Sequence, residues 1–208
     1  MKLHLLRHGQ TNWNLEGRLQ GQKNVPLNQT GKQQIERFCK QAFVHEHRGS
    51  TVTVSSKATA PTMPYCPYTI VLTSSLQRTL QSAQLCSQWF GLPLAVEPAF
   101  AERSFGVLEG MMKDEIRRQF HIEDIEALDD VHGIEPMTNF RSRLEAGLRR
   151  LPRTYRDERI LLVTHGSVIR LLMTMTSSIY AVPSSMAVSL VQSGRIVPNG
   201  HVVEMDLP

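Results

Sequence analysis

The sequence predicts an α/β protein, specifically a three-layer α/β/α sandwich with a mostly parallel central sheet. Short apolar runs of strand length alternate along the chain with segments of helical periodicity, which is the pattern of such folds. The run at 160–164, Ile-Leu-Leu-Val-Thr, has almost no polar alternation, as expected for a parallel strand buried on both faces. His8 and His165, each followed by glycine, come directly after two such runs, which places tight turns at one edge of the sheet.

Five apolar segments are predicted to be the strands. The first ends at Leu6, where polar residues take over, and the third follows the helix breakers Gly91 and Pro93. The segment near the end of the sequence is expected at an edge of the sheet. The predicted strands are residues 1–6, 68–73, 94–96, 160–164 and 202–205.

Helices are predicted where apolar residues recur with helical spacing. The first has its apolar stripe at 35–43, and Asn28 or Thr30 is expected to cap it. The residues before it, up to Leu27, are interpreted as a polar loop. The later helices are predicted at 76–90, 113–120, 139–151 with Thr138 as the cap, and 167–175.

Length and composition favour a single domain spanning residues 1–208. The stretch 49–68 is rich in Ser, Thr and Pro, and we interpret it as a surface insertion. Loops of this length are either mobile or act as lids, and a mobile insertion is the prediction here. A short hairpin at 51–54 is the alternative within it.

The overall charge narrows the class of ligand. The net charge is +4, yet no dense Lys/Arg run with interleaved aromatic residues is present, so no nucleic-acid partner is expected. No stretch approaches the roughly 18 apolar residues of a membrane span, so no membrane partner is expected either. The three cysteines show no Cys-x-x-Cys spacing, which fits a reduced, cytoplasmic setting. Several arginines instead suggest a small anionic ligand.

Three predicted strands deliver similar residues just past their carboxyl ends. The first is followed by Arg7 and His8, and the second by a segment that contains Arg78. The strand at 160–164 is followed by His165 at a helix N-terminus, where free backbone N–H groups favour an anion. Arginine presents a planar fork suited to phosphate oxygens. The sequence therefore predicts a phosphate site.

Chemistry at such a site needs a nucleophile. The sequence contains no nucleotide-binding P-loop pattern, and neither His8 nor His165 has partners at metal-ligand spacing, so no metal is expected. A neutral histidine can attack phosphorus itself, and neighbouring guanidinium groups would disfavour the charged imidazolium of His8. Glu102 is the best candidate for the acid that protonates the leaving oxygen, because the like charge of a phosphate favours its protonated form.

These residues fall within motifs that resemble the histidine phosphatase superfamily, the phosphoglycerate mutase-like proteins. Any one motif is weak, but they occur in the family's order over nearly the whole chain outside 49–68. Departures are Ser75, where the family usually has Pro, Asn24, where Asp is common, and the segment 133–136. The matching stretches are Arg7-His8-Gly9 with Thr11 and Asn14, Gly17-Arg18-Leu19-Gln20-Gly21, residues 26–31, residues 74–79, Glu102 with residues 105–110, and residues 164–170.

The resemblance implies roles for individual residues. His8 would be the phosphorylated nucleophile, and Glu102 would protonate the leaving group and then deprotonate water. Arg7, Arg78 and His165 would hold the phosphoryl oxygens. The resemblance implies no metal and no cofactor. The residues expected to border the pocket are Asn14, Arg18, Gln20 and Gly166.

The leading functional hypothesis is hydrolysis of a small phosphorylated metabolite. A phosphoglycerate mutase is the runner-up, but the acidic segment 122–130 would repel a second phosphate. A third hypothesis is a non-catalytic phospho-ligand or protein-binding module of the same fold. A fourth has a phosphorylated protein as substrate, docked by the insertion at 49–68. The sequence names neither the ester nor the oligomeric state.

Overall fold

The computed structural model of the protein describes residues 2–42, 66–179 and 197–206. Its centre is a five-stranded sheet of order β3-β2-β4-β1-β5, in which only β5 runs antiparallel to its neighbour. The predicted mostly parallel sheet and its edge strand are confirmed. The strands are β1 (Lys2–Arg7), β2 (Ile70–Thr73), β3 (Leu94–Val96), β4 (Ile160–Thr164) and β5 (Val202–Asp206).

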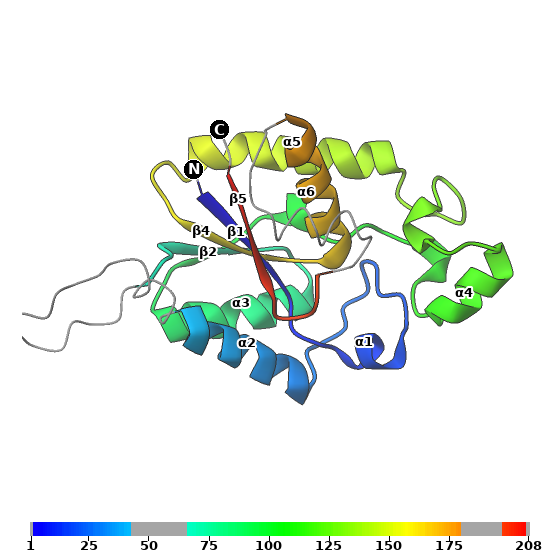
Figure 1. Cartoon of the computed structure of the whole chain (residues 1–208), viewed down its shortest axis with the longest axis horizontal. Coiled ribbons are helices and arrows are strands. Elements are labelled where there is room, and N and C mark those ends of the chain that lie inside the picture. Colours follow the sequence, from blue (N-terminus) through cyan, green and yellow to red (C-terminus); the bar gives the residue numbers. More distant parts are fainter. Residues whose placement is uncertain (1, 43–65, 180–196, 207–208) are drawn as a thin grey trace, which may run out of the picture.

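Helices cover both faces of the sheet, so the predicted three-layer sandwich is confirmed (Figure 1). One face carries α2 (Gln29–Ala42) and α3 (Gln77–Phe90), and the other carries α5 (Met137–Thr154) and α6 (Gly166–Ile179). The short α1 (Asn12–Glu16) and α4 (Lys113–Phe120) lie past the carboxyl end of β1 (Figure 1). No helix within the described part of the chain is both long and apolar enough to span a bilayer.

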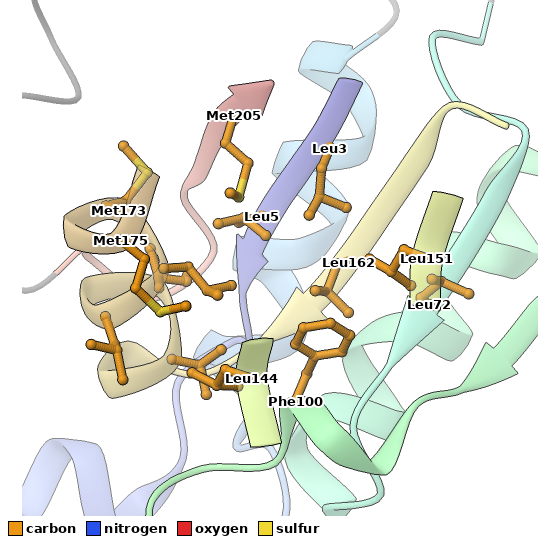
Figure 2. Close-up of a cluster of buried hydrophobic side chains, with 14 of the residues drawn as sticks. Leu3, Leu5, Leu72, Phe100, Leu144, Leu151, Leu162, Met173, Met175 and Met205 are labelled. Atoms are coloured by element: carbon orange, nitrogen blue, oxygen red, sulfur yellow. The ribbon is translucent and has the colours of Figure 1, made fainter. Parts of the chain in front are cut away.

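The larger core lies between the sheet and the α5–α6 layer. Leu3, Leu5 and Leu162 point from the strands toward side chains of these helices, among them Leu144 and Met175 (Figure 2). Each fully buried leucine of this kind contributes about 2 kcal/mol through removal of apolar surface from water. This packing fixes β1 and β4 as a pair, and with them the turns that follow both strands.

The opposite core lies between the sheet and the α2–α3 layer. Leu6 and Val163 face this side because successive strand residues point to opposite faces. Cys39, on α2, is buried here as a small hydrophobe. Tyr68 also packs in this core, so the last residue of the predicted insertion is not part of a surface loop. The rest of that prediction, residues 49–65 with the hairpin at 51–54, lies outside the described residues.

A third, smaller cluster of buried apolar side chains lies beside the sheet and does not pack on either of its faces. It joins Leu19 and Ile116 to two single-turn 3₁₀ helices, η3 (Gly106–Leu108) and η4 (Ile125–Ala127). The described strands contribute no side chain to it. This cluster supports the segment of the chain that faces the strand ends.

Two local predictions are wrong. The expected polar loop contains α1, a five-residue helix closed by reciprocal bonds between Thr11 and Asn14. It is too short to show an apolar stripe, so periodicity did not reveal it. Thr138 does not cap α5, which begins at Met137 behind Pro136, and the Met137 amide donates to Asp129 Oδ1 instead.

Of the two residues predicted to cap α2, Asn28 caps the helix and Thr30 does not. The side-chain oxygen of Asn28 accepts from the amide of Gly31 at 2.8 Å. This helix start approaches the first strand turn so closely that a Cβ on Gly9 would lie 2.4 Å from the carbonyl oxygen of Gly31. Glycine at position 9 is therefore a packing requirement, and it sets the backbone beside His8.

Candidate active site

The strand ends bring the predicted cationic and imidazole groups together. Arg7 ends β1 and His8 follows it, Arg78 is the second residue of α3 after β2, and His165 directly follows β4. Arg7, His8 and Arg78 line a cavity of about 60 Å³ together with Glu102. The ring of His165 packs edge-on against that of His8, with 5.4 Å between ring centroids. The other predicted pocket residues also line this cavity: Asn14, Arg18, Gln20 and Gly166.

His8 is held as a neutral imidazole with a defined tautomer. Its side chain is buried, and Nδ1 lies 2.7 Å from the carbonyl oxygen of Gly9. A carbonyl only accepts, so Nδ1 donates the proton and Nε2 keeps the lone pair. Burial, followed by the positive charges of Arg78 and Arg7, holds the pKa of His8 well below its usual range. The ring is therefore unprotonated at neutral pH.

Arg7 and Arg78 are fixed by backbone carbonyls and keep unused donors. Arg78 donates to the carbonyl oxygens of Lys23 and Gly21 at 2.8 and 2.7 Å, and Arg7 donates to that of Val197 at 2.6 Å. Burial lowers the pKa of Arg78 to about 10 and also lowers the pKa of Arg7, yet both stay charged at neutral pH. The Nε atoms of both arginines are buried without a partner among the described residues.

His165 completes this group. Its Nε2 lies 2.7 Å from Ser74 Oγ, and its Nδ1 is buried with no partner in the described part of the chain. Burial and then the charge of Arg78 hold the pKa of His165 well below its usual range. Buried polar atoms in folded proteins nearly all have partners. Arg7 and Arg78 line the cavity, so their unpartnered Nε–H groups suit a ligand with several acceptor oxygens, as a phosphate has.

Glu102 faces this group from another segment. Its Oε1 accepts from the Arg103 amide at 3.1 Å, and its Oε2 accepts from the Ser167 amide, at the N-terminus of α6, at 3.4 Å. Its backbone carbonyl accepts from Arg143, which also binds Glu135 through two hydrogen bonds. This Arg143–Glu135 ion pair holds the backbone at the proposed acid.

The predicted border residues differ in how firmly they are held. Gln20 is buried and accepts from the hydroxyl of Thr11 at 3.0 Å, whereas Arg18 is partly exposed and binds Glu16 and the Gly110 carbonyl. Asn14 receives a contact from Asn199, whose amide also donates to the carbonyl oxygen of His8 at 2.9 Å. Gly166 opens α6 and places its backbone at the cavity wall.

Three ionisable residues that line the cavity were not predicted as site residues: Arg170, Lys113 and Glu126. Lys113 begins α4, and burial followed by the charge of Arg7 lowers its pKa. Glu126 lies on η4, accepts from Ser167 Oγ at 2.5 Å, and has its pKa raised to about 7 by burial and then by the charge of Glu102. The only sequence signal was the acidic character of segment 122–130, which did not distinguish Glu126 from its neighbours.

The cavity is suited to an anion by the chemistry of its walls. Guanidinium groups, imidazoles and a helix N-terminus all favour negative charge. Within the described ranges, no three His, Cys, Asp or Glu side chains gather in a group that would hold a metal ion. The arrangement combines a neutral imidazole, donors for phosphoryl oxygens and a carboxyl group, which are the groups needed to move a phosphoryl group and a proton.

Comparisons with known proteins agree with this chemistry. The family model of the histidine phosphatase superfamily (branch 1) matches residues 3–60 and 55–181. The uncharacterised phosphatase PhoE of Bacillus subtilis (strain 168) is 28% identical over 174 residues, which are 83% of this chain and 76% of that protein. Phosphoglycerate mutase-like protein 4 of Arabidopsis thaliana is 30% identical over 173 residues, 80% of this chain and 66% of that protein.

A solved structure supports the fold. The phosphoglycerate mutase from Thermus thermophilus superposes with a TM-score of 0.63 at 24% identity, covering 100% of this chain and 94% of its own. At that identity the likeness concerns the fold alone. The relatives are named phosphatases or phosphoglycerate mutases, and both names imply transfer of a phosphoryl group.

Proposed function

Since this chain belongs to the histidine phosphatase superfamily, we propose that it hydrolyses a small phosphate monoester through a covalent phosphohistidine on His8. One observation carries the proposal: His8 is a buried, neutral imidazole whose Nδ1 is bound to the Gly9 carbonyl and whose side chain lines an anion-binding cavity. His165 is the weaker candidate for the nucleophile, because Ser74 Oγ lies 2.7 Å from its Nε2.

In the first step, the Nε2 lone pair of His8 attacks phosphorus while the bond from phosphorus to the ester oxygen breaks. Arg7, Arg78 and His165 donate to the three non-bridging oxygens, whose charge they stabilise. Glu102, as the general acid, gives a proton to the departing oxygen. The products are phosphohistidine, a Glu102 carboxylate and the free alcohol.

In the second step, the Glu102 carboxylate takes a proton from a water molecule that attacks phosphorus. The bond between phosphorus and Nε2 breaks, and the electron pair returns to the imidazole. Inorganic phosphate leaves, and the enzyme regains a neutral His8 and a protonated Glu102. Each group used is one of this chain's own side chains, so the proposed reaction requires no metal ion.

The charge of the cavity wall favours hydrolysis over mutase chemistry. A mutase must hold a substrate or intermediate with a second anionic group. Beyond the phosphoryl site, the wall carries Glu126, and Arg170 is already paired with Asp124 at 2.5 Å. Two further cations line the cavity: Arg18, which is paired with Glu16 at 2.6 Å, and Lys113, whose pKa is lowered by burial and by the charge of Arg7.

The test is release of inorganic phosphate from a panel of monoesters in the presence of EDTA, with 3-phosphoglycerate included. We expect metal-independent release, lost in His8→Ala. Formation of 2-phosphoglycerate without phosphate release would identify a mutase instead. Binding of phosphate without turnover of any ester would identify a binding module.

A second measurement tests the covalent step directly. A rapid quench in alkaline SDS of the enzyme with ³²P-labelled substrate is expected to trap a base-stable, acid-labile label in the wild type. The label is expected to be absent in His8→Ala and present in His165→Ala. Label in His8→Ala would place the phosphoryl group on another residue and overturn the mechanism.

A further inference from the structure

A second cavity adjoins the phosphoryl pocket. It has a volume of about 200 Å³ and lies between η4 and α6. Glu126, Ser167 and Arg170 line both cavities, so these three residues form their common boundary. The mechanism proposed above assigns no role to this larger space.

The boundary lies on the side where a leaving group must depart. Glu102 would protonate the leaving oxygen, and its Oε2 accepts from the amide of Ser167 at 3.4 Å. The hydroxyl of the same Ser167 donates to Glu126 Oε1 at 2.5 Å. A chain of contacts therefore runs from the proposed acid, through the first turn of α6, to the mouth of the second cavity.

The walls of the second cavity are largely apolar and, among the described residues, carry no unpaired positive group. Its charged residues are Asp124, Glu126 and Arg170, and Arg170 forms two hydrogen bonds to the carboxylate of Asp124. The remaining lining side chains are apolar or neutral: Ala127, Met137, Phe140, Leu171, Ser167 and Thr174.

Glu126 is the acidic side chain that lines both cavities, so its charge bears on which substrates can occupy them. The charged groups around it are Glu102, Arg103 and Arg170, with Lys113 across the phosphoryl pocket. Arg103 Nη1 is 3.8 Å from Glu126 Oε2 and donates to the backbone carbonyl of Glu126, while Nη2 donates to Asp129 Oδ1 and to the carbonyl of Leu128. The pKa of Glu126 is raised to about 7, so its carboxyl group is neutral in mild acid and negative in mild base.

We propose that the second cavity is the subsite for the alcohol part of the substrate, and that Glu126 selects alcohols that are uncharged or cationic. Esters whose alcohol carries a carboxylate or a second phosphate are disfavoured, because that charge would come next to an acidic side chain. This inference rests on the proposed hydrolysis and adds the substrate class: monoesters of compact, partly apolar alcohols without negative charge.

A matched pair of substrates tests the selection. The probes are 4-carbamoylphenyl phosphate and 4-carboxyphenyl phosphate, which have nearly the same shape and differ by one negative charge. The ratio of their kcat/KM values cancels the pH dependence of the shared chemical step. We expect this ratio, carbamoyl over carboxy, to fall about tenfold from wild type to Glu126→Gln at pH 8, the size of a moderately screened charge interaction.

The pH provides a second readout of the same charge. In the wild type the ratio is expected to rise between pH 6 and pH 8, as Glu126 loses its proton, and to stay flat in Glu126→Gln. Glu123→Gln is the matched control, because it removes the same charge from an exposed neighbour that lines neither cavity. An unchanged ratio in Glu126→Gln, or an equal change in Glu123→Gln, would overturn the selection.

The location of the subsite needs its own variant. Ala127→Trp places bulk into the second cavity at an exposed position, where folding tolerates it. We expect KM for the carbamoyl ester to rise about tenfold while inhibition by inorganic phosphate stays unchanged. An equal effect on phosphate inhibition would overturn the subsite alone. Absence of phosphate release from every ester would instead overturn the proposed hydrolysis, and this inference with it.

Discussion

The two sides of the phosphoryl pocket are built differently. The side formed by the strand ends carries Arg7, His8, Arg78 and His165, whose positions follow from a sheet packed on both faces. The opposite side carries Lys113 and Glu126, on short elements held by a separate small cluster. The first side is largely buried and cationic, and the second carries charges of both signs and is partly exposed. We infer that the sheet fixes the chemistry of the site and that the outer segment sets its selectivity.

The largest effect should come from the strand-end side, through the nucleophile. His8→Ala is expected to lower kcat at least about 10⁴-fold, because no other group can form the covalent bond. The fold should remain intact, since His8 contributes to the pocket rather than to either apolar core. Phosphate-release kinetics measure the loss, and circular dichroism with urea unfolding checks the fold. If His8→Ala turned over substrate within tenfold of the wild type, the assignment of the chemistry to the strand-end side would be contradicted.

Glu102→Gln should have the next largest effect, about 10²–10⁴-fold on kcat with poor leaving groups, because proton donation is lost. Esters of acidic alcohols need little protonation, so 4-nitrophenyl phosphate should lose much less than a simple alkyl phosphate. A Brønsted plot of kcat/KM against leaving-group pKa measures this difference. Equal losses for all leaving groups would show that Glu102 positions the substrate and does not act as the acid.

A matched pair of arginine variants compares the two sides directly. Arg78 is buried and bound to two carbonyls, whereas Arg18 is about two-fifths exposed in its side chain and paired with Glu16. Arg78→Lys should raise the inhibition constant of inorganic phosphate about 30-fold, because a lysine loses the fixed fork of donors. Arg18→Lys should change it less than about threefold. Similar effects for both would remove the distinction between the two sides.

The smallest effect concerns stability against pH, where the two sides have opposite signs. Glu126 has a raised pKa of about 7, so its stabilising contribution is complete below about pH 4.3 and is lost as the pH rises through 7. His8 and His165 have lowered pKa values, so their contribution is present above about pH 6.5 and is lost as the pH falls.

Glu126→Gln isolates the first of these trends. Relative to the wild type, the variant should gain about 2 kcal/mol in free energy of unfolding between pH 5 and pH 8. Urea unfolding at both pH values measures the difference. A difference between the two proteins that does not change with pH would show that Glu126 does not titrate in this range.

The same division explains what the sequence predicts. Strands such as β4 are unbroken apolar runs, and the residues after them meet at one edge by geometry, so His8, Arg78 and His165 could be brought together without coordinates. Lys113 and Glu126 could not. Glu126 lies on a single-turn helix, and Lys113 begins α4, whose place opposite the strand ends depends on tertiary packing. The helix α1 and the start of α5 were mispredicted for the related reason that local contacts, not periodicity, define them.

The neighbours of β1 have a consequence for how the protein folds. β1 lies between β4 and β5, and Arg7 exchanges backbone hydrogen bonds with Gly200 and His201. The strand that precedes His8 therefore gains its second neighbour from residues far away in the chain. Such distant pairing makes folding slow. The turn that carries the proposed nucleophile is thus expected to take its final position late in folding, after β5 has paired with β1.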